Sequence, residues 1–467
     1  MLKGYSEYKD VESNWINKIP IAWSFLPLQS QMKERKEKND KKQTKFILSL
    51  TAALGVIPYS EKKSGGNKAK EDITKYNIAM ENDLIVNCMN VVAGSSGISK
   101  YYGAISPVYY ALHIRNENSN IKYWEYIFRN QKFYSSLVGL GNGIIMKQSS
   151  SGKLNTVRKR IPMTKMNRVM LPVPSKSEQD KIVQFLDWKT YEMNRFIHQK
   201  KKQIKLLEEL KLTRINNLVT KGLTHDVKYK QSNIEWIGEI PEHWDVDHIK
   251  QHFKVKKRIA GKEDYDVLSI TQQGIKKKDI SSNEGQMAQS YANYQFVYPG
   301  DFAMNHMDLL TGYIDISKQF GVTSPDYRVF TLSDSEHCFA PFYLRVFQIG
   351  YKRKIFYKFG KGAANQGRWR LPITAFYDYA IQVPPIDEQR EIARQCDEVE
   401  KQINEMISRI NKEITLVEEL RTKLIFDVVT GQVDVRDVKI PIYEAETDII
   451  DSEDDTDEEN LDESMEE

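Results

Sequence analysis

The chain has 467 residues, of which 40% are hydrophobic and 11% aromatic, enough to bury substantial cores in two to four domains. No apolar stretch is long enough to cross a membrane, and the N-terminus lacks the apolar core of a signal peptide. Three widely spaced cysteines, Cys88, Cys338 and Cys396, exclude a disulfide framework and a zinc ribbon. We therefore expect a cytoplasmic protein with reduced thiols and no membrane partner.

The formal net charge of +4 is an average over two unlike segments. Fourteen acidic residues, and no Lys or Arg, lie between residues 444 and 467. The rest of the chain carries 68 basic against 50 acidic side chains, a net charge of +18. A body this basic predicts a polyanionic partner, most simply nucleic acid. The acidic tail, residues 442–467, is predicted to be disordered, either as a solubility segment or as a DNA mimic.

The sequence repeats itself once, in the same order throughout, with an offset that drifts from 221 to 210 residues. The matched pairs are NWINKIPIAW (14–23) and EWIGEIPEHW (235–244), ILSLT (47–51) and VLSIT (267–271), ISKYYGAISPVY (98–109) and ISKQFGVTSPDY (316–327), RIPMT (160–164) and RLPIT (370–374), VPSKSEQ (173–179) and VPPIDEQ (383–389), and LLEELK (206–211) and LVEELR (416–421). This pattern indicates a tandem duplication, and hence a pseudo-two-fold internal repeat.

Each repeat begins with a globular part, residues 1–174 and 224–384. Short β-rich runs such as 266–270, 296–298 and 327–332 alternate there with Gly, Pro and Asn. This composition predicts a compact domain that mixes helices and strands, of the α/β or α+β class.

Each repeat ends in a long helical segment, residues 175–223 and 385–441. Residues 175–178 form a plausible capping box, and Asp387 is the expected N-cap of the second helix. Apolar steps of three and four predict a coiled coil. The expected seam comprises Ile182, Leu186, Lys189, Met193, Phe196, Lys200, Ile204, Leu207 and Leu210 in the first helix, and Ile392, Cys396, Val399, Ile403, Met406, Ile410, Ile414, Val417, Leu420 and Leu424 in the second.

The direction of helix packing follows from the length of the connection between the repeats. A helix of about 43 residues spans about 65 Å. Residues 222–234 could cover at most about 43 Å when fully extended, too little to return to the start of a parallel helix. The sequence therefore predicts two globular domains joined by two long antiparallel coiled-coil helices. Two similar but non-identical basic domains on a spacer fit recognition of a bipartite DNA site with half-sites about 34 Å apart.

The repeated motifs resemble the specificity subunits of type I restriction–modification systems. The similarity rests on EWIGEIPEHWDV (235–246), the VPP-x-x-EQ junction (383–389), the two EEL runs (208–210 and 418–420) and VTG (429–431), and it extends over residues 14–437. The first repeat departs from the pattern at Asn17 and Lys18, which replace Gly238 and Glu239, and at Ser175, which stands where the second repeat has a proline. These departures indicate that the two halves have diverged.

The resemblance implies two target recognition domains, each recognising one half of an asymmetric bipartite site in double-stranded DNA. It implies a non-catalytic subunit whose helices set the spacer and dock two methyltransferase subunits, with restriction and translocase subunits joining the complex. N6-adenine methylation would then belong to the partners. S-adenosylmethionine, ATP and Mg would be bound by those partners, and no cofactor by this chain.

Three basic stretches supply candidate DNA contacts, because Arg and Lys suit phosphates or guanine, and Asn and Gln suit adenine. The candidates are Lys147, Ser150, Lys153, Arg158 and Arg160 in the first repeat, and Lys254, Lys256, Lys257, Arg258, Lys361, Asn365, Gln366, Arg368 and Arg370 in the second. A solvated basic surface would have the same composition. Motifs present in both copies, such as 106–109 and 324–327, are predicted to be fold elements.

No catalytic or metal-binding motif stands out. Methylase (N/D)PPY, Walker A and GxGxxG sequences are missing. His248 and His252 have i,i+4 spacing but no third ligand in the pattern, so we expect surface histidines. Two alternatives to a DNA-specificity subunit remain at this point: a coiled-coil scaffold that does not recognise DNA, and a self-contained nuclease or methylase, which the missing motifs disfavour.

Overall fold

The computed structural model describes residues 3–52, 54–62, 69–70, 72–88, 95–115, 118–141, 147–148, 154–155, 160–223, 227–280, 288, 290–362 and 369–443. The chain forms two compact units. The first comprises Met1–Lys201 with Asn411–Glu467, and the second comprises Lys202–Ile410. Each unit therefore holds one globular domain together with part of both long helices. The predicted disordered tail lies, from residue 444 onward, outside the described residues.

The first unit is built on a four-stranded antiparallel sheet of order β4 (Met32–Glu34), β11 (Tyr109–Ile114), β8 (Leu84–Asn87), β9 (Ser96–Ile98). The remaining strands pair as β1 (Tyr8–Asp10) with β2 (Lys18–Pro20), β3 (Ser24–Pro27) with β14 (Met170–Val173), β5 (Leu48–Thr51) with β6 (Gly55–Pro58), β7 (Asn77–Ala79) with β10 (Gly103–Ile105), and β12 (Lys147–Gln148) with β13 (Leu154–Asn155). The short helices are α1 (Leu28–Gln31), α2 (Ile121–Phe128), α3 (Gln131–Leu137) and α4 (Met163–Met166).

The second unit repeats this topology. Its sheet has the order β18 (Phe253–Lys256), β25 (Arg328–Leu332), β22 (Phe302–Met304), β23 (Ile314–Ile316). The other pairs are β15 (Tyr229–Gln231) with β16 (Glu239–Pro241), β17 (Asp245–His248) with β26 (Ala380–Val383), β19 (Leu268–Thr271) with β20 (Gly274–Lys277), and β21 (Gln295–Val297) with β24 (Gly321–Thr323). Its short helices are α6 (Ile249–His252), α7 (Ala340–Lys352), α8 (Ile355–Lys358) and α9 (Ile373–Tyr377). Every strand pair of the first unit except β12–β13 has a counterpart among the described strands of the second, so the predicted internal repeat is confirmed.

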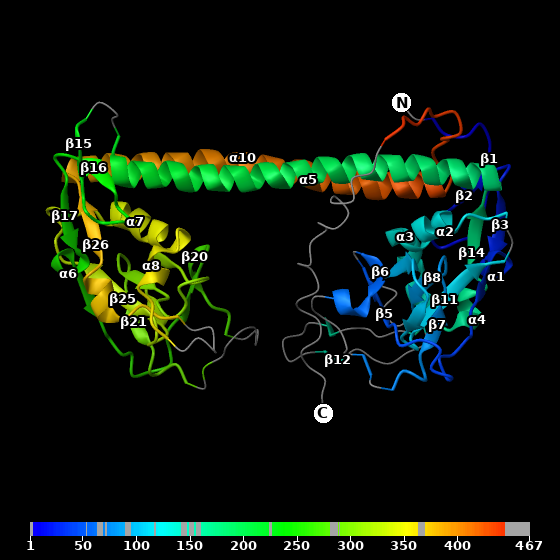
Figure 1. Cartoon of the computed structure of the whole chain (residues 1–467), viewed down its shortest axis with the longest axis horizontal. Coiled ribbons are helices and arrows are strands. Elements are labelled where there is room, and N and C mark those ends of the chain that lie inside the picture. Colours follow the sequence, from blue (N-terminus) through cyan, green and yellow to red (C-terminus); the bar gives the residue numbers. More distant parts are fainter. Residues whose placement is uncertain are drawn as a thin grey trace. The chain divides into compact units, whose positions relative to one another are not determined.

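Each sheet has a core on both of its faces. Successive side chains of a strand point to opposite faces, so one strand contributes to both cores. On β22, Phe302 and Met304 join the main core of the second unit, whereas Ala303 joins a smaller core on the other face. On β8, Leu84 and Val86 face the main core of the first unit, and Ile85 faces the smaller one. Figure 1 shows α2 and α3, and likewise α7 and α8, between their sheet and the long helices.

The long helices are α5 (Lys176–Lys221) and α10 (Ile386–Val429). In the first unit they run antiparallel, since Asn194 bonds Arg421 while Lys200, further along α5, pairs with Glu413 at 2.7 Å. The second unit has the same direction, because Ile215, near the end of α5, shares a core with Ile392, near the start of α10. The predicted antiparallel packing is confirmed within each unit. None of the described helices is long and apolar enough to cross a membrane.

The glutamine of the repeated EQ motif fastens each domain to its helix. Gln179 is fully buried; its side-chain oxygen accepts from the Asn120 amide at 2.8 Å and its nitrogen donates to the Pro174 carbonyl at 3.0 Å. Gln389 is also fully buried and makes the matching bonds to the Phe339 amide and the Pro384 carbonyl. A buried amide with both groups bonded fixes the geometry of each junction.

The helix ends differ from the prediction in three places. Glu178 does not complete the capping box, because its carboxylate accepts a hydrogen bond from Tyr5 at 2.6 Å. Asp387 lies in the first turn of α10, which begins one residue earlier. The same helix ends at Val429, not at 441, and Val435 beyond it is buried in the core of the first unit.

The predicted seam is correct only in part. Ile182, Leu186, Ile392, Cys396, Ile403 and Ile414 are buried as expected. Phe196, Leu210, Met406 and Leu420 are exposed, and Ile197, Ile215 and Val219 are buried although they were not assigned to the seam. Each helix packs against a domain as well as against the other helix, so its buried stripe does not keep the strict heptad phase.

Candidate nucleic-acid interface

The structure describes the side chains of seven of the fourteen predicted contact residues. Arg160, Lys254, Lys257, Lys361 and Arg370 are exposed, and Lys256 and Arg258 are half-buried. Lys147 lies in β12, of which only the backbone is described. Ser150, Lys153, Arg158, Asn365, Gln366 and Arg368 lie outside the described residues.

The lysines of β18 lie on the edge strand of the sheet in the second unit. Strand alternation directs Phe253 and Val255 to the main core, so Lys254 and Lys256 point to the opposite face. Lys257 follows directly and is exposed. Lysines on an edge strand also discourage pairing with another sheet, so their position is compatible with DNA contact without requiring it.

Arg258 has a different environment from these lysines. Its guanidinium forms an ion pair with the buried Asp301 and lies over the Tyr298 ring, 4.8 Å from the centroid. In the first unit, Arg35 forms the same kind of pair with the buried Asp83, at 2.7 Å. Because both domains contain this clamp, the geometry indicates a structural role for Arg258.

The repeated RIPMT and RLPIT segments are anchored to the sheet in the same way in both units. The Ile161 amide donates to the Cys88 carbonyl at 3.1 Å, and the Tyr110 hydroxyl donates to the Ile161 carbonyl at 2.9 Å. Burial raises the pKa of Cys88 and of Tyr110, so the side chains of this anchor are neutral except for Arg160.

In the second unit, His306 and Arg328 occupy the positions of Cys88 and Tyr110. The Leu371 amide donates to the His306 carbonyl at 2.9 Å, and Arg328 Nη2 donates to the Leu371 carbonyl at 2.9 Å. Arg328 is 6% exposed and lies over the Phe376 ring, 4.7 Å from the centroid. The anchor therefore has the same backbone geometry but more positive charge.

At neutral pH the second anchor contains a protonated arginine and a neutral histidine. Burial lowers the pKa of Arg328 to about 10, which leaves it protonated at neutral pH. Burial, together with Arg328 and Arg370, lowers the pKa of His306 to about 3, so the imidazole is neutral. Lys361 lies opposite Arg370 in an antiparallel bridge, with amide-to-carbonyl distances of 2.8 and 3.2 Å. His306 and Arg328 were not among the predicted residues, although alignment of the two repeats points to them.

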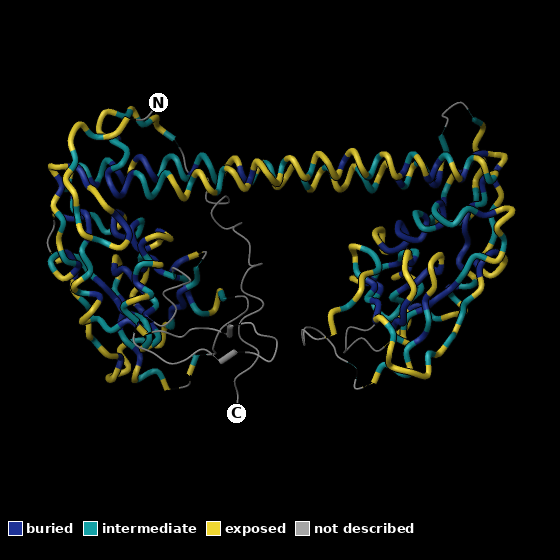
Figure 2. Tube along the Cα trace, turned by 180° about the vertical axis from the view of Figure 1, so that it is seen from behind, coloured by how far each residue is buried: buried dark blue, intermediate teal, exposed yellow. Residues whose placement is uncertain are grey.

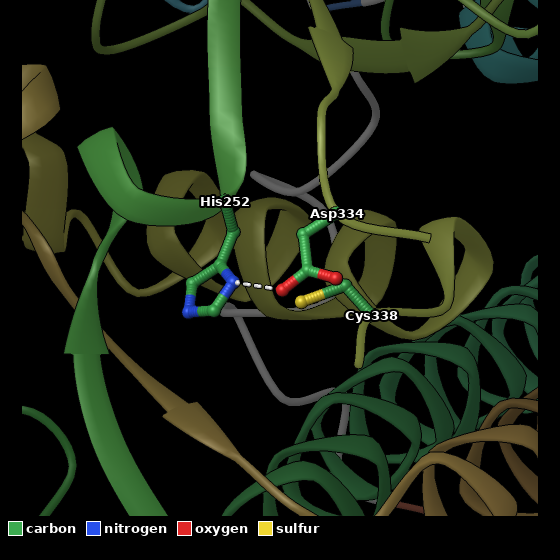
Figure 3. Close-up of side chains that lie close together, drawn as sticks. All are labelled: His252, Asp334 and Cys338. Carbon is green, nitrogen blue, oxygen red and sulfur yellow. Dashed lines mark hydrogen bonds and ion pairs between the residues drawn. The ribbon is translucent and has the colours of Figure 1, made fainter. Parts of the chain in front are cut away.

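A second polar cluster in this unit contains His252, Asp334 and Cys338 (Figure 3). Each could offer one ligand atom to a metal ion, and the three atoms lie within 4.8 Å of one another. His252 is 7% exposed, so its prediction as a surface histidine is wrong, whereas His248 is exposed. Both ring nitrogens of His252 already meet carboxylates: Nε2 lies 2.9 Å from Asp247 and Nδ1 lies 3.2 Å from Asp334.

The corresponding positions of the first unit show that the cysteine of this cluster has a structural partner. Ser119 stands at the place of Cys338, and its hydroxyl accepts from the Trp124 indole at 2.6 Å. Cys338 makes the corresponding hydrogen bond with Tyr343, and burial raises its pKa to about 11. We therefore interpret the cluster as a hydrogen-bonded link between α6 and the segment before α7.

The comparisons with known proteins agree with this architecture. The family model for the type I restriction modification DNA specificity domain matches twice, over residues 30–206 and 241–416. A protein of Methanocaldococcus jannaschii named as the type I restriction enzyme MjaX specificity subunit is 23% identical over 387 residues, which cover 79% of this chain and 82% of that protein.

One solved structure shows the same fold. A chain from a study of complex assembly and conformational transition of the type I R-M system superimposes with a TM-score of 0.60 at 10% identity, covering 90% of this chain and all of that one. The HsdS subunit from Thermoanaerobacter tengcongensis matches with a TM-score of 0.45 at 12% identity, covering 89% of this chain and 98% of that one. Both matches of the family model fall on the duplicated domains and the helices that follow them, and together they cover most of the sequence. The chain belongs to the type I restriction–modification DNA specificity family, as a specificity subunit with two target recognition domains.

Proposed function

We propose that each target recognition domain binds one half of an asymmetric bipartite site in double-stranded DNA, while this chain contributes no catalytic group to methylation or cleavage. The observation that carries the proposal is a shared topology with diverged residues. The four-stranded sheet recurs strand by strand, yet equivalent buried positions next to the candidate contacts differ, as with Tyr110 and Arg328. Two domains of one fold that differ in sequence are suited to two different half-sites.

The long helices are proposed to dock two methyltransferase subunits. Each unit exposes three large apolar side chains of these helices at matching positions: Phe196, Leu416 and Leu420 in the first, and Met406, Leu206 and Leu210 in the second. Leu206 and Leu416 are exposed by 63% and 64%. Figure 2 shows exposed residues recurring along both helices. Equivalent apolar surfaces in both units fit two copies of one partner.

This docking has a direct test with matched variants. Leu206→Glu and Leu416→Glu place a charge on equivalent surfaces, so each is expected to remove one methyltransferase subunit, and the double variant both. Native mass spectrometry of the co-expressed complex measures the stoichiometry. Full occupancy in the double variant would contradict docking at these positions.

In this assembly the partner subunits would bind S-adenosylmethionine, ATP and Mg, and restriction and translocase subunits would join the complex in the cytoplasm. A scaffold that does not recognise DNA is not favoured, because the specificity-domain match covers both globular domains. The proposal is tested by methylome sequencing of cells with and without the gene for this chain. We expect one bipartite motif of methylated adenines to disappear on deletion, and an unchanged methylome would refute DNA recognition by this subunit.

A further inference from the structure

We infer that Lys361 and Arg370, supported by the buried Arg328, form a binding site for one backbone phosphate of DNA in the second domain. The inference rests on the proposed function and adds to it a ligand group and one residue, Arg328, that was not among the residues predicted from the sequence. It follows from three independent features: the bridge, the buried charge and the comparison with the first domain.

The bridge places two cations side by side. Lys361 and Arg370 exchange both backbone hydrogen bonds across an antiparallel pair, so their side chains leave the same face with Cβ atoms about 5 Å apart. Like charges directly opposite each other destabilise such a pair. Both residues are exposed, and neither has an ion-pair partner among the residues that the structure describes. A shared anion would remove the repulsion.

Next to the bridge, a guanidinium has no counter-ion among the described residues: Arg328 donates to the carbonyl of Leu371, the residue after Arg370. Arg328 is almost fully enclosed, its Nη1 has no hydrogen-bond partner among the described residues, and Nδ1 of the adjacent His306 has none either. A buried charge without a counter-ion is costly, and its field is weakly screened inside the protein. Since Arg370 is exposed and Arg328 is not, the anion would contact Arg370 and Lys361, with Arg328 acting as a positioning residue.

The first domain shows that this charge is not needed for the fold. At the matching position Tyr110 makes the same bond, to the Ile161 carbonyl at 2.9 Å, without any charge. Arg328 makes the bond to Leu371 at the same length. Anchoring of the segment therefore does not explain the arginine, whereas an anion bound by the neighbouring Arg370 does. A backbone phosphate is the anion that DNA presents at every position.

The test uses the complex of the full chain with its methyltransferase subunits and a duplex that carries the motif found by methylome sequencing. Arg328→Tyr keeps the anchor in the form used by the first domain and removes the charge. Arg370→Gln removes the proposed direct contact. Lys358→Gln is the matched control, because it removes one exposed charge of the same domain that is already paired with Glu235. Affinity is measured over a range of KCl concentrations, and stability by urea unfolding.

We expect Arg370→Gln to weaken binding about tenfold and to reduce the slope of log affinity against log salt by about 0.9. Arg328→Tyr should weaken binding severalfold without lowering the unfolding midpoint, and Lys358→Gln should change neither. When each phosphate of the duplex is replaced in turn by a neutral methylphosphonate, one replacement should weaken binding by the natural complex. The same replacement should not weaken binding by the Arg370→Gln complex.

Two outcomes would overturn the inference. If Arg328→Tyr unfolds the domain more easily and leaves the affinity of the folded complex unchanged, the arginine is structural. If Arg370→Gln changes which bases are methylated, the residue recognises a base and not a phosphate. Failure of the unmodified complex to bind the duplex would instead refute the proposed function, and with it this site.

Discussion

A few buried and half-buried polar side chains fix the helix junction and the edge strand of each domain. Gln179 and Gln389 fix the junctions with the helices, and the pairs Arg35–Asp83 and Arg258–Asp301 fix the edge strand of each sheet. These contacts recur in both units, so they define the fold. The anchors at Tyr110 and Arg328 share a geometry but differ in charge, and the proposed phosphate site of the second domain depends on this difference.

The neutral His306 makes the second domain sensitive to acid. Its pKa, lowered from 6.5 to about 3, means that the unfolded chain takes up a proton below pH 6.5 while the folded domain does not. The contribution of the neutral His306 to the unfolding free energy is fully present above pH 6.5, and it is lost as the pH falls towards 3. Between pH 7 and 5 the unfolding free energy should fall by about 1–2 kcal/mol more in the natural chain than in His306→Asn. Urea unfolding at the two pH values measures the difference, and parallel pH profiles would contradict it.

The sequence could not separate Arg258 from its lysine neighbours. All four residues belong to one basic run, but the acidic partner of Arg258 lies 43 residues away, and a local pattern carries no information about it. The same limit applies to one of the two partners of His252, because Asp334 lies 82 residues away, whereas Asp247 lies five residues away. Alignment of the repeats recovers part of this information, because it pairs Tyr110 with Arg328 and Cys88 with His306.

Glycines with positive φ end both long helices at equivalent places. Gly222 has φ of 76° and Gly431 has φ of 72°, the left-handed conformation that commonly closes a helix. At Gly431 the constraint is also steric, because a Cβ would lie 2.4 Å from Pro20 Cδ on β2. The turn therefore packs α10 directly onto the strand pair β1–β2, and the repeat of this arrangement at Gly222 explains the shared VTG and VTKG sequences.

Gly431→Ala should lower the unfolding free energy of the first unit by more than the cost of the left-handed backbone conformation alone. Gly238→Ala is the control, since Gly238 has φ of 73° but nothing within 4 Å of an added Cβ. The control should cost about 1–2 kcal/mol for the left-handed conformation. Gly431→Ala should cost at least about 1 kcal/mol more, because backbone or Pro20 must move. Equal losses of unfolding free energy in the two variants would show that the close contact is relaxed without cost.

Element-level prediction succeeded where one physical period determined the outcome. Both helices and the duplicated domains followed from apolar spacing and repeated motifs, and the direction of the helices followed from the length of the connection between the repeats. The seam was wrong at Phe196, Leu210, Met406 and Leu420 because a heptad pattern assumes a single partner surface. In each unit the helices also contact a domain, as Arg345 of α7 does with Glu400 of α10 at 2.8 Å. That tertiary contact is not encoded in helix periodicity.

Over the whole molecule, α5 and α10 each continue from one unit into the other, so their lengths are expected to set the spacer in the DNA site. Inserting seven residues after Lys201 and seven after Ile410 keeps the helical phase of the heptad and adds about 10 Å to each helix. At about 3.4 Å per base pair, the methylated motif should gain about three base pairs of spacer with unchanged half-sites. Methylome sequencing reads the spacer directly, and an unaltered spacer would show that helix length does not set it.

Each domain is proposed to recognise its own half-site independently of the other domain. The most direct measurement replaces residues 1–174 with those of another family member and sequences the methylome of cells that carry the hybrid. We predict a motif in which one half-site changes while the other half-site is retained. A hybrid of normal abundance that changes both half-sites, or neither, would contradict the account.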